Sequence, residues 1–195
     1  QDLAKNNLNQ IEIIINDLSK NIYQFLLFRN ELKSSKNTLL LLDHIDDEIR
    51  KMKHLILKLG TLNDPTIPIE SYLRYVDSKD HNLLPLVLEL IDSTFTKNSA
   101  KLILPLIDPD FDPTQIAANI LGEIVISKEK MLKYWVENSN QWKTNISIKF
   151  LLSTKNNKVM EKIDWGQLSE GLINSRYFSK LERDYLSHIS NNHFK

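Results

Sequence analysis

Two apolar segments of similar sequence, LELID at residues 88–92 and LPLID at residues 104–108, constrain the fold of this chain most strongly. Each segment ends at an aspartate, and each places apolar residues on more than one side of a helix. A short helix with this pattern is typical of a stack in which every helix is covered by the helices before and after it. The pair therefore predicts a helical repeat, although neither segment points to a particular reaction.

The first sixty residues have apolar positions at alternating steps of four and three residues, as in the seam of a coiled coil. The first seam comprises Leu8, Ile11, Ile15, Leu18, Ile22, Phe25 and Leu32, with Arg29 where the next apolar residue is due. A second seam follows a polar turn and comprises Leu42, Ile45, Ile49, Met52, Ile56 and Leu59. Because the linker at 34–37 is short, the sequence predicts an antiparallel hairpin of two long helices.

Further apolar residues of the hairpin lie outside these seams. They are Ile13, Ile14, Leu26, Leu27, Phe28 and Leu55. Burial of these side chains needs more than one partner helix, so we expect the hairpin to dock on the rest of the chain.

After Gly60, a plausible end of a helix, frequent prolines divide the chain into short helices. We predict them near residues 67–77, 80–95, 97–107, 113–126, 128–139, 141–153, 157–163, 165–174 and 179–190. Asp64, Asp80 and Asp112 are expected to cap helix starts. Pro85 and Pro105 lie deeper and should kink their helices or mark the true starts. The predicted fold is all-α, a HEAT-like helical repeat (α–α superhelix) over 61–195 preceded by the long antiparallel helical hairpin of 1–60, in a single domain.

Composition supports a helical domain and excludes some functions. Four glycines and little period-two alternation argue against a sheet, and 42% hydrophobic residues suffice for one well-buried domain. The absence of cysteine excludes disulfides, thiolate metal sites and a cysteine nucleophile. No apolar run is long enough to span a membrane. Since the chain opens at Gln1 without a methionine or a signal pattern, we expect a fragment of a longer protein or a processed form.

The charge is zero overall but unevenly distributed. Residues 61–125 carry four basic and ten acidic residues, whereas residues 126–195 carry twelve basic and seven acidic residues. Such polarity can steer an anionic partner or a phospholipid surface, although solvated outer faces of helices also produce it.

Residues 48–108 resemble a HEAT-type helical repeat segment. The resemblance rests on the basic and apolar helix ending at Leu59, on Asp64 and Pro65, and on VLELID and LPLID. More narrowly, the segment is similar to that of bacterial multidomain proteins with an ATP/ADP-translocase-like membrane region and often a cyclic-nucleotide-binding domain. The resemblance to HEAT-type segments implies a cytoplasmic scaffold or regulatory module. The narrower similarity further implies that this module is tethered to a membrane region in the full-length protein.

This chain also departs from that family. Ser93 stands where the family would have a polar amide after the aspartate, and the four glycines stand apart. A cyclic-nucleotide site needs several clustered glycines and an arginine-bearing phosphate loop, so nucleotide binding is not carried over.

The best metal candidate is Asp108, Asp110 and Asp112, which share the one, three, five spacing of a calcium loop. The loop would then need a glycine at Pro113 and a bidentate glutamate at Asn119, so cap and turn roles are favoured. His44 is expected near Asp47 and Glu48 on an exposed strip. The histidines form no HExxH spacing, and no GxSxG is present. We therefore predict no catalytic, cofactor-binding or metal-binding residues.

The stretch from Lys128 to Lys162 is basic and contains aromatic residues. Candidate interaction residues are Lys128, Lys130, Lys133, Tyr134, Trp142, Lys143 and Trp165. Trp135 is expected in the core, because Met131, Leu132 and Val136 form one apolar stripe with it. Trp142 and Trp165 stand near predicted helix starts and are better candidates for an interface.

Three functional hypotheses follow. The leading one is a non-enzymatic helical-repeat scaffold, or regulatory protein-interaction module, that binds a protein partner or an adjoining domain of its own polypeptide. The alternative is a nucleic-acid-binding helical-repeat protein, with a base-modifying enzyme as one form of it, which uses the basic region 128–162 and binds in a salt-dependent way. The third is self-association through the long heptad helices.

Overall fold

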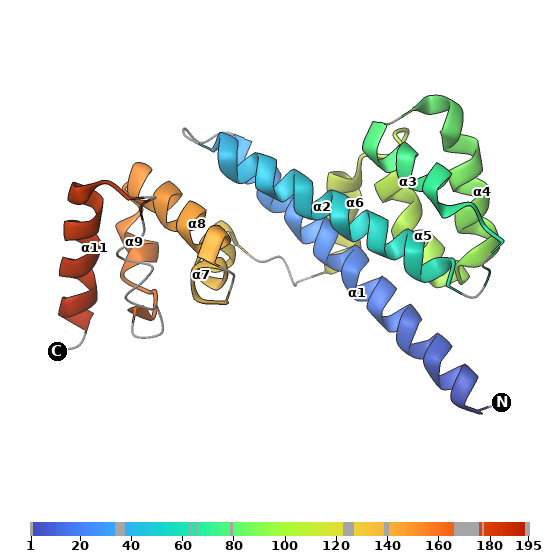
Figure 1. Ribbon diagram of the computed structural model, residues 1–195, viewed down its shortest axis with the longest axis horizontal. Helices are drawn as coiled ribbons and strands as arrows, with labels where there is room; N and C mark the ends of the chain where they lie inside the picture. Colours follow the sequence, from blue (N-terminus) through green and yellow to red (C-terminus); the bar gives the residue numbers. More distant parts are fainter. Residues whose placement is uncertain are drawn as a thin grey trace. The chain divides into compact units, whose positions relative to one another are not determined.

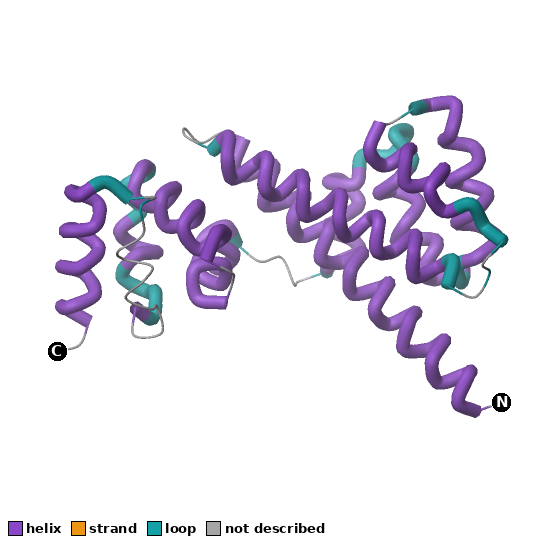
Figure 2. The backbone as a smooth tube through the Cα atoms, in the orientation of Figure 1, coloured by secondary structure: helices purple, strands orange, loops and turns teal. Residues whose placement is uncertain are grey.

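The computed structural model describes residues 2–33, 38–62, 64, 66–78, 80–122, 127–138, 141–165, 176 and 178–193. Over these residues all regular structure is helical and no strand is present (Figure 2). The helices are α1 Asp2–Lys33, α2 Leu39–Gly60, α3 Ile69–Ser78, the 3₁₀ turn η1 His81–Leu83, α4 Leu84–Thr94, α5 Lys97–Ile107, α6 Pro113–Leu121, α7 Lys128–Asn138, α8 Gln141–Ser153, α9 Asn157–Met160 and α11 Lys180–His193. The all-α class is confirmed, and the HEAT-like superhelix and the hairpin stay predictions.

The chain divides into two compact units. Unit 1 comprises Gln1–Arg29 and His44–Val125, and unit 2 comprises Asn30–Asp43 and Ile126–Lys195. Most of α1 and α2 therefore belongs with α3 to α6, while the end of α1 and the first turn of α2 belong with α7 to α11. The expectation of a single domain over 1–195 stays a prediction. No helix in the described part of the chain combines the length and apolar character that a membrane crossing requires.

In unit 1, α1 and α2 lie side by side (Figure 1). The guanidinium of Arg29 donates two hydrogen bonds to Asp46, with an Nη2 to Oδ2 distance of 2.8 Å, so the residue that interrupts the first seam forms an ion pair between the helices. Buried seam residues are Ile15 and Ile22 on α1 and Ile45, Ile49 and Ile56 on α2. Ile11, Leu18, Phe25, Met52 and Leu59 are half-buried and Leu8 is exposed, so the heptad spacing marks only part of the surface that becomes buried.

The expected burial of the apolar residues outside the seams is confirmed only in part. Phe28 is buried, and Leu26 and Leu27 are half-buried. Ile13, Ile14 and Leu55 are exposed, so the expectation is wrong for these three. Helices α1 and α2 therefore each keep some apolar side chains in contact with solvent.

Helix α5 connects the other helices of unit 1 through its backbone carbonyls. The hydroxyl of Tyr23 on α1 donates to Leu102 O at 2.8 Å. The last turn of a helix leaves carbonyls without helical donors. Those of α5 accept instead from Lys53 Nζ on α2, at Leu106 O, and from the Tyr75 hydroxyl on α3, at Ile107 O. Since these donors come from three helices, they fix where α5 ends relative to its neighbours.

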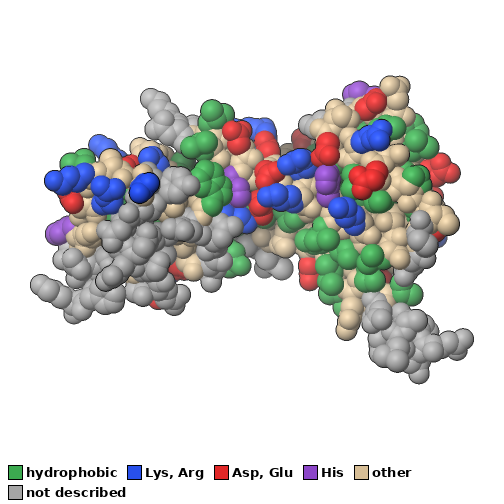
Figure 3. All heavy atoms as spheres, viewed as in Figure 1, with side chains coloured by type: hydrophobic (Ala, Val, Ile, Leu, Met, Phe, Trp, Pro, Cys, Tyr) green, Lys and Arg blue, Asp and Glu red, His purple; other side chains and the backbone are tan. Residues whose placement is uncertain are grey.

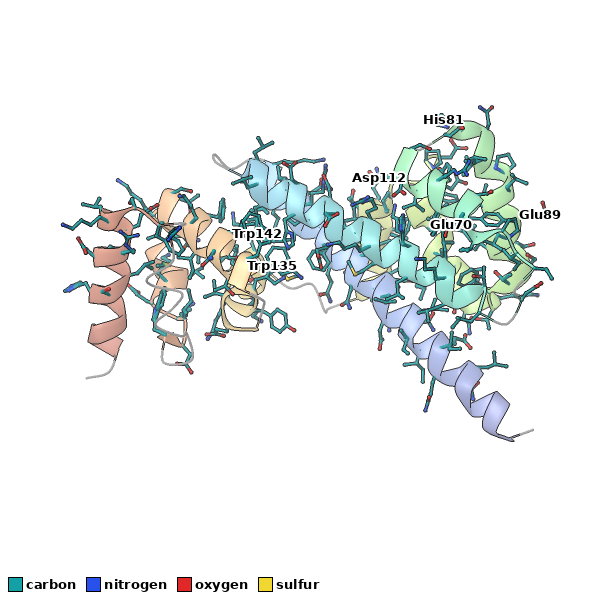
Figure 4. All side chains as sticks on the ribbon, in the orientation of Figure 1. Glu70, His81, Glu89, Asp112, Trp135 and Trp142 are labelled. Carbon is teal, nitrogen blue, oxygen red and sulfur yellow. The ribbon has the colours of Figure 1, made fainter. Side chains whose placement is uncertain are left out.

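The predicted caps form as expected at two positions. The Asp80 carboxylate accepts from Asn82 N at the start of η1, and that of Asp112 (Figure 4) accepts from Thr114 N at the start of α6. Asp64 accepts from Thr66 N in a turn that precedes α3, so it does not cap that helix. Asp108 accepts from Asp110 N, the turn role favoured over calcium binding.

Several predicted boundaries match the structure. Helices α5 and α8 have the predicted bounds, and Gly60 ends α2. Pro85 marks a true start, since it lies in the first turn of α4, whereas Pro105 lies inside α5. The predicted helix 113–126 is too long, because α6 ends at Leu121. The helix predicted at 165–174 lies outside the described residues except for Trp165.

Unit 2 is built around α8, which packs on α7 and α9. The buried residues of α8 are Thr144, Asn145, Ile146, Ser147, Ile148, Phe150 and Leu151. Because these positions point in nearly every direction around the helix, α8 is covered on most of its sides. The Thr144 hydroxyl lies 3.3 Å from both Trp135 O and Val136 O, near the end of α7, and ties the two helices together.

Candidate interaction surface

The predicted interaction residues fall on three elements of unit 2. Lys128, Lys130, Lys133 and Tyr134 lie on α7, Trp142 and Lys143 lie on α8, and Trp165 follows α9. Tyr134 is 59% exposed and Lys130 is exposed, while Lys128, Lys133 and Lys143 are half-buried. Lys133 Nζ pairs with Glu137 Oε1 at 3.6 Å along the same helix. The four α7 residues therefore stand on one helix, and two of them, Lys130 and Tyr134, are exposed.

Trp165 does not lie on the surface, so the exposure expected for it is wrong. Only 2% of the residue is exposed, and its indole N–H donates to Met160 O at 3.0 Å. Helix α9 is a single turn, so its last carbonyls need donors from outside the helix. The indole meets that need, and Val159, Met160 and Ile163, which precede it closely in the chain, are buried as well. Trp135, in contrast, is buried as predicted (Figure 4).

An apolar groove of about 490 Å³ lies along α8. It is lined by Leu40, Leu41, Trp142, Asn145, Ile146, Lys149, Phe150 and Ser153, and we call it the α8 groove. Its six α8 residues follow one another at alternating steps of three and one, which places them on one face of the helix. The two leucines come from the first turn of α2, and all eight residues belong to unit 2.

The floor and the rim of the α8 groove differ. Leu41, Ile146 and Phe150 are buried and form its floor. Leu40 is 62% exposed and Trp142 is 44% exposed, so both offer apolar surface at the rim. Among the described lining residues, Lys149 alone carries a charge. The groove is therefore an apolar trough with one cationic side chain, which suits an apolar ligand bearing a negative charge.

A second hollow, of about 630 Å³, shares one lining residue, Ser153, with the α8 groove. Its other lining residues are Leu151, Leu152, Lys155, Met160, Leu181, Glu182, Asp184 and Tyr185. Glu182 and Ser179 form a capping box at the start of α11, since Glu182 Oε2 accepts from Ser179 N and Ser179 Oγ accepts from Glu182 N. Burial raises the pKa of Glu182, but the hydrogen bonds from Ser179 and the charge of Lys149 together lower that pKa below its usual range.

Unit 1 carries a charged cluster on α2 and α3. Asp47 pairs with Arg50 and with Lys51, the latter at 2.6 Å, and His54 Nε2 lies 2.9 Å from Asp77 Oδ1. The described residues contain no group of three or more histidine or acidic side chains placed to hold a metal ion. Asp47, which was expected beside His44, thus forms ion pairs with two basic side chains of its own helix.

The sequence alone indicated only some of the residues that line the α8 groove. Trp142 and the neighbouring Lys143 were among the predicted residues, whereas Leu40, Ile146 and Phe150 were not. A run of four leucines at 39–42, directly after a polar turn, was the available signal for Leu40. Comparison with family models, with curated proteins and with solved structures finds no match to this chain.

Proposed function

We propose that this chain is a non-enzymatic helical scaffold, or regulatory protein-interaction module, whose α8 groove binds an amphipathic acidic helix of a protein partner. The single observation that carries the proposal is the apolar trough with exposed Leu40 and Trp142 at its rim. Contiguous exposed apolar surface with a lined hollow is typical of protein-binding surfaces, and tryptophan is enriched where binding energy concentrates.

The dimensions of the groove fit a helix. From Trp142 to Ser153 the lining face of α8 rises by about 16 Å, which corresponds to about three helical turns. A partner helix with apolar residues at positions i, i+4, i+7 and i+11 presents a stripe of that length. Trp142 would then pack at one end of the stripe, while Phe150 and Ser153 meet the other end.

Charge supports an acidic occupant. Lys149 is the charged side chain of the groove, and residues 126–195 carry twelve basic against seven acidic residues. A partner with acidic residues beside its apolar stripe would be attracted to this region and would be held in one register by Lys149. A basic amphipathic helix would be repelled.

The helix can come from a separate protein or from an adjoining domain of the same polypeptide. The resemblance of residues 48–108 to HEAT-type repeat segments supports a scaffold that forms part of a larger multidomain protein, in the cytoplasm and attached to a membrane region elsewhere in its sequence. In such scaffolds the stacked helices form an extended surface, and modest flexing passes strain between attached modules. The HEAT-like superhelix and the hairpin are part of this proposal.

Selection of peptides tests the binding chemistry. A display library of amphipathic helices with an apolar i, i+4, i+7, i+11 stripe and randomised remaining positions is selected against the chain. We expect enrichment of acidic residues and a dissociation constant that rises at least about tenfold in Trp142→Ala and in Leu40→Glu. Tyr134→Ala is the matched control, because Tyr134 is an exposed aromatic residue that does not line the groove. Enrichment of basic peptides, or binding that ignores Trp142 and Leu40, contradicts the proposal.

The source of the natural helix needs a second experiment. Segments that flank this chain in its gene are expressed separately and titrated against wild type and Trp142→Ala. Binding that depends on Trp142 identifies an internal partner, and its absence points to a separate protein. Duplex and single-stranded oligonucleotides titrated at low salt serve as the test of the nucleic-acid alternative, which is dropped if they do not associate.

A further inference from the structure

Lys149 lies close to the start of α11 as well as to the α8 groove. It lines the groove, and Ser153, one helical turn later on the same face of α8, lines both the groove and the second hollow. Glu182 of α11 lines that second hollow together with Ser153. All three residues belong to unit 2. The cation of the groove is therefore one turn away from the hollow that holds the carboxylate of Glu182.

The position of Glu182 is fixed by its role at the start of α11. Its Oε2 accepts from Ser179 N at 2.7 Å, and Ser179 Oγ accepts from Glu182 N at 3.3 Å. This capping box holds the carboxylate in one place. Burial raises the pKa of Glu182, while the hydrogen bonds from Ser179 and the charge of Lys149 lower it. The charge of Lys149 thus acts on this carboxylate as well as on the groove.

The surroundings of the groove are basic. Residues 126–195 carry twelve basic and seven acidic residues, and basic side chains gather on the face of α8 and α11 that Figure 3 shows. An ionised carboxylate among these cations lowers the positive potential nearby. Glu182 therefore reduces the attraction that an acidic occupant of the groove meets at Lys149.

We propose that Glu182 acts through Lys149 as a positioning residue that sets how strongly the α8 groove prefers an acidic occupant over a neutral one. The inference rests on the proposed function, because it concerns the helix that the groove binds. Glu182 and a carboxylate of that helix compete for the charge of one lysine. Since Glu182 is not among the described residues that line the groove, it affects this preference without contributing to the apolar contacts.

Two peptides separate this effect from damage to the groove. One is an acidic helix selected on the groove, and the other is the same peptide with its carboxylates replaced by amides. Glu182→Gln removes the charge but keeps the capping box, because glutamine accepts the same hydrogen bond from Ser179 N. We expect Glu182→Gln to tighten the acidic peptide about two- to fivefold and to leave the dissociation constant of the neutral peptide unchanged.

Two further variants control the measurement. Asp184→Asn removes an exposed carboxylate of the same helix that lines the same hollow, and it should change the preference by less than about 1.5-fold. In Lys149→Gln the preference for the acidic peptide should decrease. Glu182→Gln should then have no further effect, because the cation for which the carboxylates compete is gone.

Carboxyl ¹³C shifts followed by NMR give a second readout. Coupling between two sites is reciprocal, so the acidic peptide should raise the pKa of Glu182, and the neutral peptide should not. A preference that is equal in wild type and Glu182→Gln, or that Glu182→Gln still alters in Lys149→Gln, overturns this inference while the binding itself stands. Absence of peptide binding to wild type overturns the proposed function and this inference together.

Discussion

The ring of Phe95 packs directly against the backbone of Gly60. A Cβ atom placed on Gly60 would overlap this ring. Gly60 is the last residue of α2, and Phe95 follows α4 and is buried. The absence of a side chain at Gly60 thus allows the end of α2 to approach the corner between α4 and α5.

Gly60→Ala should destabilise the protein by about 1–3 kcal/mol, because the added methyl group forces the Phe95 ring out of its packed position. Urea unfolding followed by circular dichroism measures the change. Lys58→Ala, an exposed substitution in the same last turn of α2, should change the free energy of unfolding by less than about 0.5 kcal/mol.

The double variant Gly60→Ala with Phe95→Leu tests whether the ring is the cause. Leucine lacks the ring atoms that the new methyl group would meet, so the double variant should lose less stability than the sum of the two single variants. Strict additivity would show that the cost of Gly60→Ala arises elsewhere.

Trp142 and Trp165, the two tryptophans that the sequence suggested for an interface, should respond differently to replacement. Trp165→Phe removes the indole N–H that donates to Met160 O and leaves a gap in the core, so we expect a loss of about 1–3 kcal/mol. Trp142→Phe keeps an aromatic ring at the rim of the α8 groove and should change the free energy of unfolding by less than about 0.5 kcal/mol. Equal losses from both substitutions would contradict the burial of Trp165.

Local sequence signals predicted the parts of the fold that depend on local chemistry. The bounds of α5 follow from Thr96, which caps its first turn, and from Asp108, where the apolar period stops. The end of α6 was missed because apolar residues continue the helical period to position 126. The helix ends instead at Leu121, because the next residue is Gly122, whose φ of 59° a residue with a side chain rarely adopts.

The candidate site depends on contacts that no local pattern contains. Leu40 lines the α8 groove with Ile146 and Phe150, more than a hundred positions later in the chain. Period and charge identify each helix face but do not say which faces meet. Trp165 was predicted at an interface for the same reason. Its indole donates instead to Met160 O at the end of the single turn of α9, a contact that no local pattern indicates.

Asp47 should titrate at an unusually low pH. Hydrogen bonds from Lys51 and from Arg50 lower the pKa of its carboxyl to about 2. Carboxyl ¹³C shifts followed by NMR measure this pKa, and Lys51→Gln should raise it toward the usual value near 3.8. Lys58→Gln removes a charge from the same helix without touching Asp47 and should leave the pKa nearly unchanged. Because a lowered pKa favours the folded state, this small contribution to stability is present above about pH 4 and is lost as the pH falls through about 2.

Tyr23 should make the protein sensitive to alkaline pH. Burial raises the pKa of its hydroxyl above the usual value of about 10, and the hydroxyl donates to Leu102 O at 2.8 Å. The unfolded chain therefore loses this proton at a lower pH than the folded protein does. The contribution of Tyr23 to stability is complete below about pH 10 and decreases as the pH rises above that value toward the folded pKa.

Tyr23→Phe should cost about 1–2 kcal/mol at pH 7, because Leu102 O loses a donor, and should flatten the loss of stability between pH 9 and about 11. Thermal unfolding across this range measures both effects. Tyr134→Phe serves as the control, since Tyr134 is an exposed tyrosine and its removal should leave the alkaline limb as steep as in the wild type.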